Sequence, residues 1–118
     1  MIKNLIKNLK KRTDVTGYSW GTGFNSSQTI SIHRSGQIVN VYLWLETTTD
    51  LTTSWKTVLS GLPSTGLTST AFTSVASYNG KSVILRVIDD RLEARSGTSS
   101  STSYNSYANI MYIAATGN

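Results

Sequence analysis

The sequence predicts an all-β domain, an antiparallel sandwich or jelly-roll-like barrel with a short N-terminal helix. Three observations lead to this prediction. Of the 118 residues, 35 are Ser or Thr and nine are Gly, a composition typical of short strands joined by tight turns. Beyond residue 15, several segments alternate apolar and polar residues, which is the period of a half-buried strand. Turn signals separate these segments regularly, so we expect seven or eight strands.

One domain is expected at this length, and its core is large enough to fold without a disulfide or a structural metal. The chain has no cysteine, which excludes disulfide scaffolds, cysteine-based zinc sites and thiol catalysis. No apolar run approaches the roughly 20 residues that span a bilayer, so we expect no membrane insertion. The basic N-terminal stretch has no apolar core after it and is not typical of an export signal.

The first twelve residues have the pattern of an amphipathic helix. Their apolar residues recur at i, i+3, i+4 and i+7, as Ile2, Leu5, Ile6 and Leu9. The segment also holds five basic and no acidic residues, which accounts for the whole formal charge of +5. So short a helix is marginal alone in water, and we expect the stripe to associate with other copies of the chain. A basic face that attracts nucleic acid or a membrane surface is the alternative. We therefore divide the chain into a helix at 1–15 and a β-domain at 16–118.

Residues 17–24 (GYSWGTGF) are expected to form an irregular first strand. The clearest hairpin lies in Thr29–Glu46, with Ser35-Gly36 as its two-residue turn. This turn pairs Ile32 with Val39 on an apolar face that continues through Leu43 and Leu45. The opposite face then contains Ser31, His33, Ile38, Asn40, Tyr42, Trp44 and Glu46.

A second hairpin is expected in Ser82–Arg95, with Asp89-Asp90 as its turn. In this register Arg86 lies opposite Glu93 on the outer face and forms a cross-strand ion pair. The other expected elements are a polar loop at Thr47–Ser54, strands at Trp55–Leu59, Ala71–Ser77 and Tyr107–Ala114, turns at 61–63 and 79–80, and a mobile loop at Ser96–Asn105.

The titratable residues do not favour an enzyme. His33 is the only histidine, so a zinc site without cysteine would need three carboxylates around it. A nucleophile-elbow pattern of the G-x-S-x-G type is absent. Asp89 and Asp90 are adjacent, whereas a glycosidase needs two carboxyl groups that face each other. We expect no catalytic activity, no metal and no cofactor.

The sequence contains residues that are better suited to binding a ligand than to catalysis. Tyr42 and Trp44 share a strand face with His33, and Trp55 and Asp50 lie in or beside the polar loop that follows. A saccharide site packs an aromatic ring on the apolar face of a sugar and uses polar side chains to bond its hydroxyls. These five residues are the expected ligand site. The alternative is that the aromatic rings belong to the core or to a subunit interface.

The order of motifs resembles the C-terminal head domains of receptor-binding or tail-fibre proteins from phages of Gram-positive bacteria. Over about Tyr18 to Ala114, the similarity rests on TISIHRSGQIVNVYLWLE, SWKTVLSGLPSTG, SVILRVIDDRLEARSG and the terminal SYANIMYIAA. Gln37 replaces an asparagine common in the family, and the Leu-Pro turn lacks the Tyr-Arg-Pro that often follows it.

This resemblance implies a homotrimeric β-domain, a neck stub at residues 1–15 and non-enzymatic binding of a cell-surface carbohydrate of the host. It also implies a place in the virion, at the tail tip or fibre, with other tail proteins as partners. Two alternatives are a structural tail or decoration subunit without a ligand and a small nucleic-acid-binding β-barrel. A hydrolase ranks behind them, because it would need facing carboxylates in a cleft.

Overall fold

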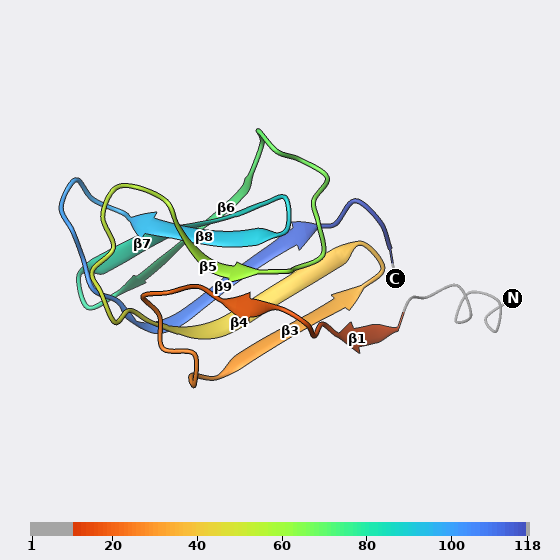
Figure 1. The fold of residues 1–118 in the computed structure, drawn as a ribbon, viewed down its shortest axis with the longest axis horizontal. Coiled ribbons are helices and arrows are strands. Elements are labelled where there is room, and N and C mark those ends of the chain that lie inside the picture. The colour runs from red at the N-terminus through yellow and green to blue at the C-terminus, as the bar shows by residue number, and fades with distance from the viewer. Residues whose placement is uncertain (1–10, 118) are drawn as a thin grey trace, which may run out of the picture.

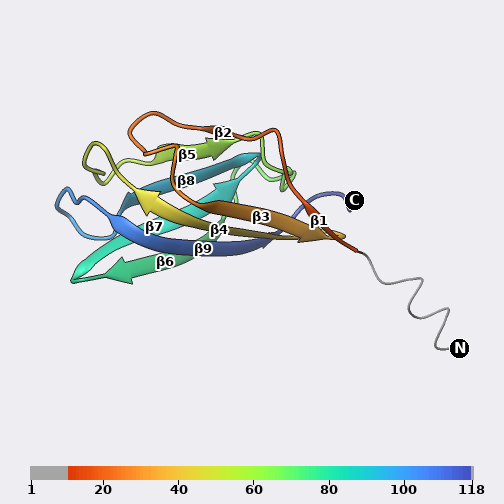
Figure 2. The same cartoon turned by 90° about the horizontal axis from the view of Figure 1, so that it is seen from below.

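The computed structural model describes residues 11–117, which form two antiparallel β-sheets packed face to face (Figures 1 and 2). This arrangement confirms the all-β class and the sandwich. Within the described residues there is no helix, and so none that could cross a membrane. The nine strands are β1 (Arg12–Asp14), β2 (Ser19–Trp20), β3 (Ile30–Ser35), β4 (Ile38–Glu46), β5 (Lys56–Ser60), β6 (Phe72–Tyr78), β7 (Lys81–Ile88), β8 (Arg91–Ser96) and β9 (Asn105–Ile113).

The first sheet, called sheet A here, has the order β1-β3-β4-β9, and the second, sheet B, has the order β2-β5-β8-β7-β6. The last strand of the chain therefore pairs with β4 near the middle of the sequence. Strand β6 is at an open edge of sheet B and runs alongside β9 (Figure 2). This places the outer face of sheet A next to the free edge of β6.

The β3–β4 hairpin has the predicted faces but not the predicted turn. Ser35 pairs with Ile38 and Ile32 with Val41, so the two-residue turn is Gly36-Gln37. The predicted Ser35-Gly36 turn is wrong by one residue. Gly36 has a φ of 59°, and a glycine with positive φ at the first turn position is typical of a type II′ hairpin. Moving the turn by one residue shifts the pairing by two, which leaves every side chain on its predicted face.

The β7–β8 hairpin forms in the predicted register. Val87 pairs with Leu92 on the core face, and Arg86 pairs with Glu93 on the outer face. The Arg86 Nε donates to Glu93 Oε1 over 2.6 Å, which confirms the predicted ion pair. Asp89 adopts a φ of 54° in the turn, and its side chain accepts a hydrogen bond from Ser64.

The core lies between the sheets and is built from the inward residues of both. Sheet A contributes Val41, Leu43 and Leu45, all fully buried, as the alternation in β4 predicts. Sheet B contributes the alternate apolar residues of β7, together with Leu92. At about 25 cal/mol per Å² of apolar surface, this continuous layer is the main stabilising contribution.

The structure tests the predicted N-terminal helix only at its last residues, because the described part of the chain begins at residue 11. The predicted helix Met1–Arg12 and its oligomerisation stripe lie almost entirely outside the described residues. At Arg12–Asp14, inside the proposed 1–15 segment, the chain forms strand β1 and pairs with β3 instead of continuing a helix. Thr13 and Val15 are β-branched, which favours this extended backbone.

Other boundaries differ from the predictions by one or two residues, as in β5, β6 and β9. The predicted irregular strand at 17–24 is ordered as a strand only at Ser19–Trp20. The predicted mobile loop at Ser96–Asn105 begins within β8 and ends in β9, and hydrogen bonds tie it to the rest of the domain. Its Thr102 forms an antiparallel bridge with Leu51, and Ser96 N donates to Thr52 O over 2.7 Å.

Candidate functional site

The candidate site lies on the outer face of sheet A, where β4 and β9 pair. Their register places side chains in rows that cross both strands. One row joins Trp44 to Tyr107, and the next joins Tyr42 to Asn109. Because alternate residues of a strand point to opposite faces, all four side chains lie on the side away from the core.

Three aromatic rings form a cluster across these rows. Tyr42 stacks on Tyr107 with ring centroids 5.2 Å apart, and Trp44 meets Tyr107 edge-on at 4.7 Å. Tyr107 is 50% exposed and Tyr42 is 40% exposed. The cluster therefore offers ring surface to solvent while the rings hold one another in place.

Asparagine side chains position the edges of the cluster. The Trp44 indole Nε1 donates to Asn105 Oδ1 over 2.5 Å. Asn109 Nδ2 donates to Asn40 Oδ1 over 2.6 Å and to the Val41 carbonyl over 2.9 Å. Amides carry both donors and acceptors, so the same groups are suited to bonding hydroxyls of a ligand.

An open groove of about 390 Å³ runs beside this cluster. One wall is formed by Tyr42, Tyr107 and Asn109, and the other by the free edge strand β6 from Ser74 to Ser77. An edge strand presents backbone N–H and C=O groups that no neighbouring strand satisfies. Aromatic surface, amides, hydroxyls and backbone groups thus converge on one hollow.

Two further hollows continue along the boundary between β6 and β9. At one end, an open hollow of about 310 Å³ is bordered by apolar residues, including Ile38, Phe72 and Met111. At the other end, about 240 Å³ lies between Tyr78, Lys81 and Asn105. Since β6 and β9 run antiparallel along this boundary, the three hollows follow one another from an apolar end to an end that carries a lysine.

The backbone under the cluster is supported from the core side. Tyr104 is 2% exposed, and its hydroxyl donates to the backbone carbonyl of Tyr107 over 3.0 Å. Burial raises the pKa of Tyr104, so this donor keeps its proton at neutral pH. The position of Tyr107 is therefore fixed by packing and by a buried hydrogen bond.

The structure brings together only part of the predicted site. Tyr42 and Trp44 are in the aromatic cluster, and His33 lies on the same face, paired with Asn40. His33 Nδ1 is buried and has no hydrogen-bond partner among the described residues. Asp50 is exposed in the connection between β4 and β5. Trp55 lies just before β5, and its ring contacts Arg86 of β7 and Arg95 of β8, which places it against the other sheet of the sandwich.

Tyr107, Asn105 and Asn109 complete the site but were absent from the predicted set. The alternation of exposed and buried residues in β9 shows that they share one face. The sequence does not show which strand lies beside that face, because β4 and β9 are separated by almost half of the chain.

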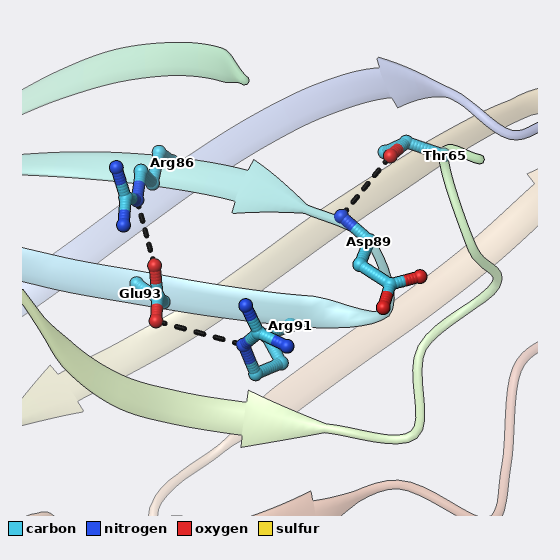
Figure 3. A network of polar contacts seen from close by, with 5 residues as sticks. All are labelled: Thr65, Arg86, Asp89, Arg91 and Glu93. Carbon is cyan, nitrogen blue, oxygen red and sulfur yellow. Dashed lines mark hydrogen bonds and ion pairs between the residues drawn. The ribbon is translucent and has the colours of Figure 1, made fainter. Parts of the chain in front are cut away.

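Among the residues that the structure describes, no three His, Cys, Asp or Glu side chains lie together so that they could hold a metal ion. The two glutamates have structural partners instead. On sheet B, Glu93 lies between Arg86 and Arg91, as Figure 3 shows. On sheet A, one carboxylate oxygen of Glu46 accepts hydrogen bonds from Asn25 and Gln28, each over 2.7 Å.

The hydrogen bonds of Glu46 make a pH-dependent contribution to stability. The amides of Gln28 and Asn25 lower the pKa of this carboxyl below its usual value in the folded state. The stabilisation is then complete above the unfolded pKa of about 4.3 and is lost as pH falls through the lower folded value. We expect Glu46→Gln to unfold at a lower temperature than the parent at pH 7, with the difference shrinking from about pH 5 downward. Thermal unfolding of both proteins across this range tests this, and a constant difference would contradict it.

No protein-family model matches the chain, and neither a curated protein sequence nor a solved structure is significantly similar to it.

Proposed function

We propose that this chain is a non-enzymatic adhesion domain of a phage virion, and that it binds a saccharide of the host cell surface in the groove between β4–β9 and β6. The observation that carries the proposal is the exposed cluster of Tyr42, Trp44 and Tyr107 beside Asn109 and the free edge of β6. A pyranose ring packs its apolar face on aromatic surface, while amides and backbone groups bond its hydroxyls.

The resemblance to phage head domains supports the same proposal from the sequence side. It adds a homotrimeric assembly with other tail proteins as partners. Weak single-site binding to a repetitive surface polymer becomes strong when several copies engage at once. The mass of the native chain in solution tests the assembly, and a particle that stays monomeric at high concentration would contradict it.

The saccharide site is tested with cell-wall polysaccharide or a glycan array and two alanine variants. We expect Tyr107→Ala to weaken binding by about tenfold, or ~1.4 kcal/mol, because it removes the ring that contacts both other rings of the cluster. Trp55→Ala is the matched control, since it removes an aromatic ring from the opposite sheet. Loss of binding in the Trp55 variant alone would place the ligand on sheet B and overturn the proposed groove.

A structural virion subunit is the second candidate, and one observation favours it. Ile38, Met111 and Ile113 are 53%, 62% and 54% exposed at one end of the same sheet face. Contiguous exposed apolar side chains are typical of protein contacts. This candidate predicts no saccharide binding, with Tyr42 and Trp44 buried between subunits. Binding measurements on the assembled protein separate the two.

A further inference from the structure

The outer face of sheet B carries a group of arginines around Trp55. Arg86 of β7 has its guanidinium carbon 4.1 Å from the centre of the Trp55 ring, and Arg95 of β8 has its own at 5.2 Å. Arg91 lies on the same strand face as Arg95, nearer to the β7–β8 turn. Three guanidinium groups thus share one face of the sheet.

This face has fewer negative groups than positive ones. Glu93 is the carboxylate that pairs with these arginines, at 2.6 Å from Arg86 Nε and 3.6 Å from Arg91 Nε (Figure 3). Arg95 forms no ion pair with any described residue, and its Nη1 donates to the Ser96 carbonyl over 3.2 Å. The turn residues Asp89 and Asp90 lie beyond Arg91, at the end of the face away from Arg95.

Like charges close together on a sheet face reduce stability, and the single carboxylate of Glu93 compensates Arg86 and Arg91 but not Arg95. The excess positive charge beside Trp55 therefore indicates a role outside the fold. Their side chains are also held in place. Glu93 is only 8% exposed and engages the Nε edge of Arg86, which leaves the Nη groups of that guanidinium available. Trp55 holds both cations by contact with its ring. Less side-chain entropy is then lost when an anion binds.

The geometry also indicates the class of ligand. Because guanidinium groups lie against the Trp55 ring, a base or sugar would have to displace them in order to stack there. A tetrahedral oxyanion would displace nothing, since arginine bonds phosphate oxygens through paired N–H groups. We infer that Arg86 and Arg95 form a second binding site beside Trp55, which takes a phosphate group. This site is independent of the saccharide groove, because it lies on the opposite sheet.

The test is to titrate the native chain with inorganic phosphate and to monitor the NMR signals of the Trp55 indole N–H and the arginine Nε–H groups. We expect saturable shifts of these signals that weaken as sodium chloride is added. Arg95→Gln should weaken phosphate binding by about tenfold, or ~1.4 kcal/mol. The phosphate affinity of Arg95→Lys should lie between those of Arg95→Gln and the parent, because lysine keeps the charge but not the planar pair of donors. Thermal unfolding establishes that both variants are folded.

The matched control is Arg12→Gln, which removes the same charge from an exposed position on β1 of sheet A. It should bind phosphate like the parent, and equal weakening in both Gln variants would show a net-charge effect and overturn the site. Tyr107→Ala should leave the phosphate response unchanged even if it abolishes saccharide binding, so the two sites fail separately. Polyphosphate and a single-stranded oligonucleotide distinguish the source of the phosphate. Tighter binding of the oligonucleotide than of polyphosphate would overturn phosphate recognition in favour of the bases.

Discussion

Replacing Tyr112 with alanine should lower the free energy of unfolding by about 3–5 kcal/mol, the largest effect that we expect of any single side chain. Tyr112 of β9 is 1% exposed and is among the largest fully buried residues. Its ring packs against Phe72 of β6 at 6.3 Å, so it links the two sheets where their strands lie side by side. Alanine would leave a cavity there that the surrounding strands can fill only in part.

The Tyr112 hydroxyl makes a separate and smaller contribution. It donates to the Pro63 carbonyl over 2.8 Å, and burial raises its pKa, so it remains a donor at neutral pH. Tyr112→Phe keeps the ring and removes only this bond, and should cost about 1 kcal/mol. Equilibrium unfolding in urea measures both variants. A similar cost for the two would show that the hydrogen bond, rather than the packing of the ring, dominates at this position.

Gly21→Ala should also lower the free energy of unfolding strongly. Here the cause is lack of space for a side chain and not the loss of contacts. A Cβ at Gly21 would lie 2.0 Å from the Thr57 carbonyl oxygen, a backbone atom that cannot rotate away. The chain would have to move off β5 and give up the bond from Gly21 N to Val58 O, now 2.8 Å. Overpacking of this kind costs typically 1–3 kcal/mol, and we expect about 3 kcal/mol because the obstacle is backbone.

Gly117→Ala is the control for this substitution. A Cβ there would meet its nearest neighbour at 3.7 Å, an ordinary contact. The change should be neutral or slightly stabilising, because alanine restricts the unfolded chain. Unfolding midpoints of the two variants and the parent test whether only the substitution at Gly21 destabilises the fold. A stable Gly21→Ala protein would mean that β2 and β5 can separate without cost.

The local pattern of the sequence was sufficient to predict faces and hairpins. Alternation over β3–β4 and β7–β8 predicted which residues are buried, and the Arg86–Glu93 pair followed from the second hairpin. The pattern cannot choose between Ser35-Gly36 and Gly36-Gln37 as the first turn, because both turns bury the same residues. The choice depends on where the chain requires a positive φ, which is at Gly36.

The candidate site was less predictable, since it depends on pairing between distant segments. Tyr42 and Trp44 were recognised from their own strand, but Tyr107 reaches them only because β9 pairs with β4. Trp55 follows the same polar loop in the sequence, yet its ring lies against Arg86 and Arg95 of the other sheet. Composition shows that binding residues are present, but topology decides which of them meet the same ligand.

The pairing of β9 with β4 also has a consequence for synthesis of the chain. Ile38 pairs with Ile113 and Glu46 with Asn105, so sheet A lacks its fourth strand until residues 105–113 have been made. Contacts so distant in sequence slow folding, because a long loop must close before they form. Until then the aromatic edge of β4 is exposed on the growing chain. Chains that are being made on the same messenger RNA would then be close together while their strand edges are unpaired, and unpaired edges promote aggregation. The amount of folded protein therefore depends on how fast β9 pairs after synthesis as well as on the final stability.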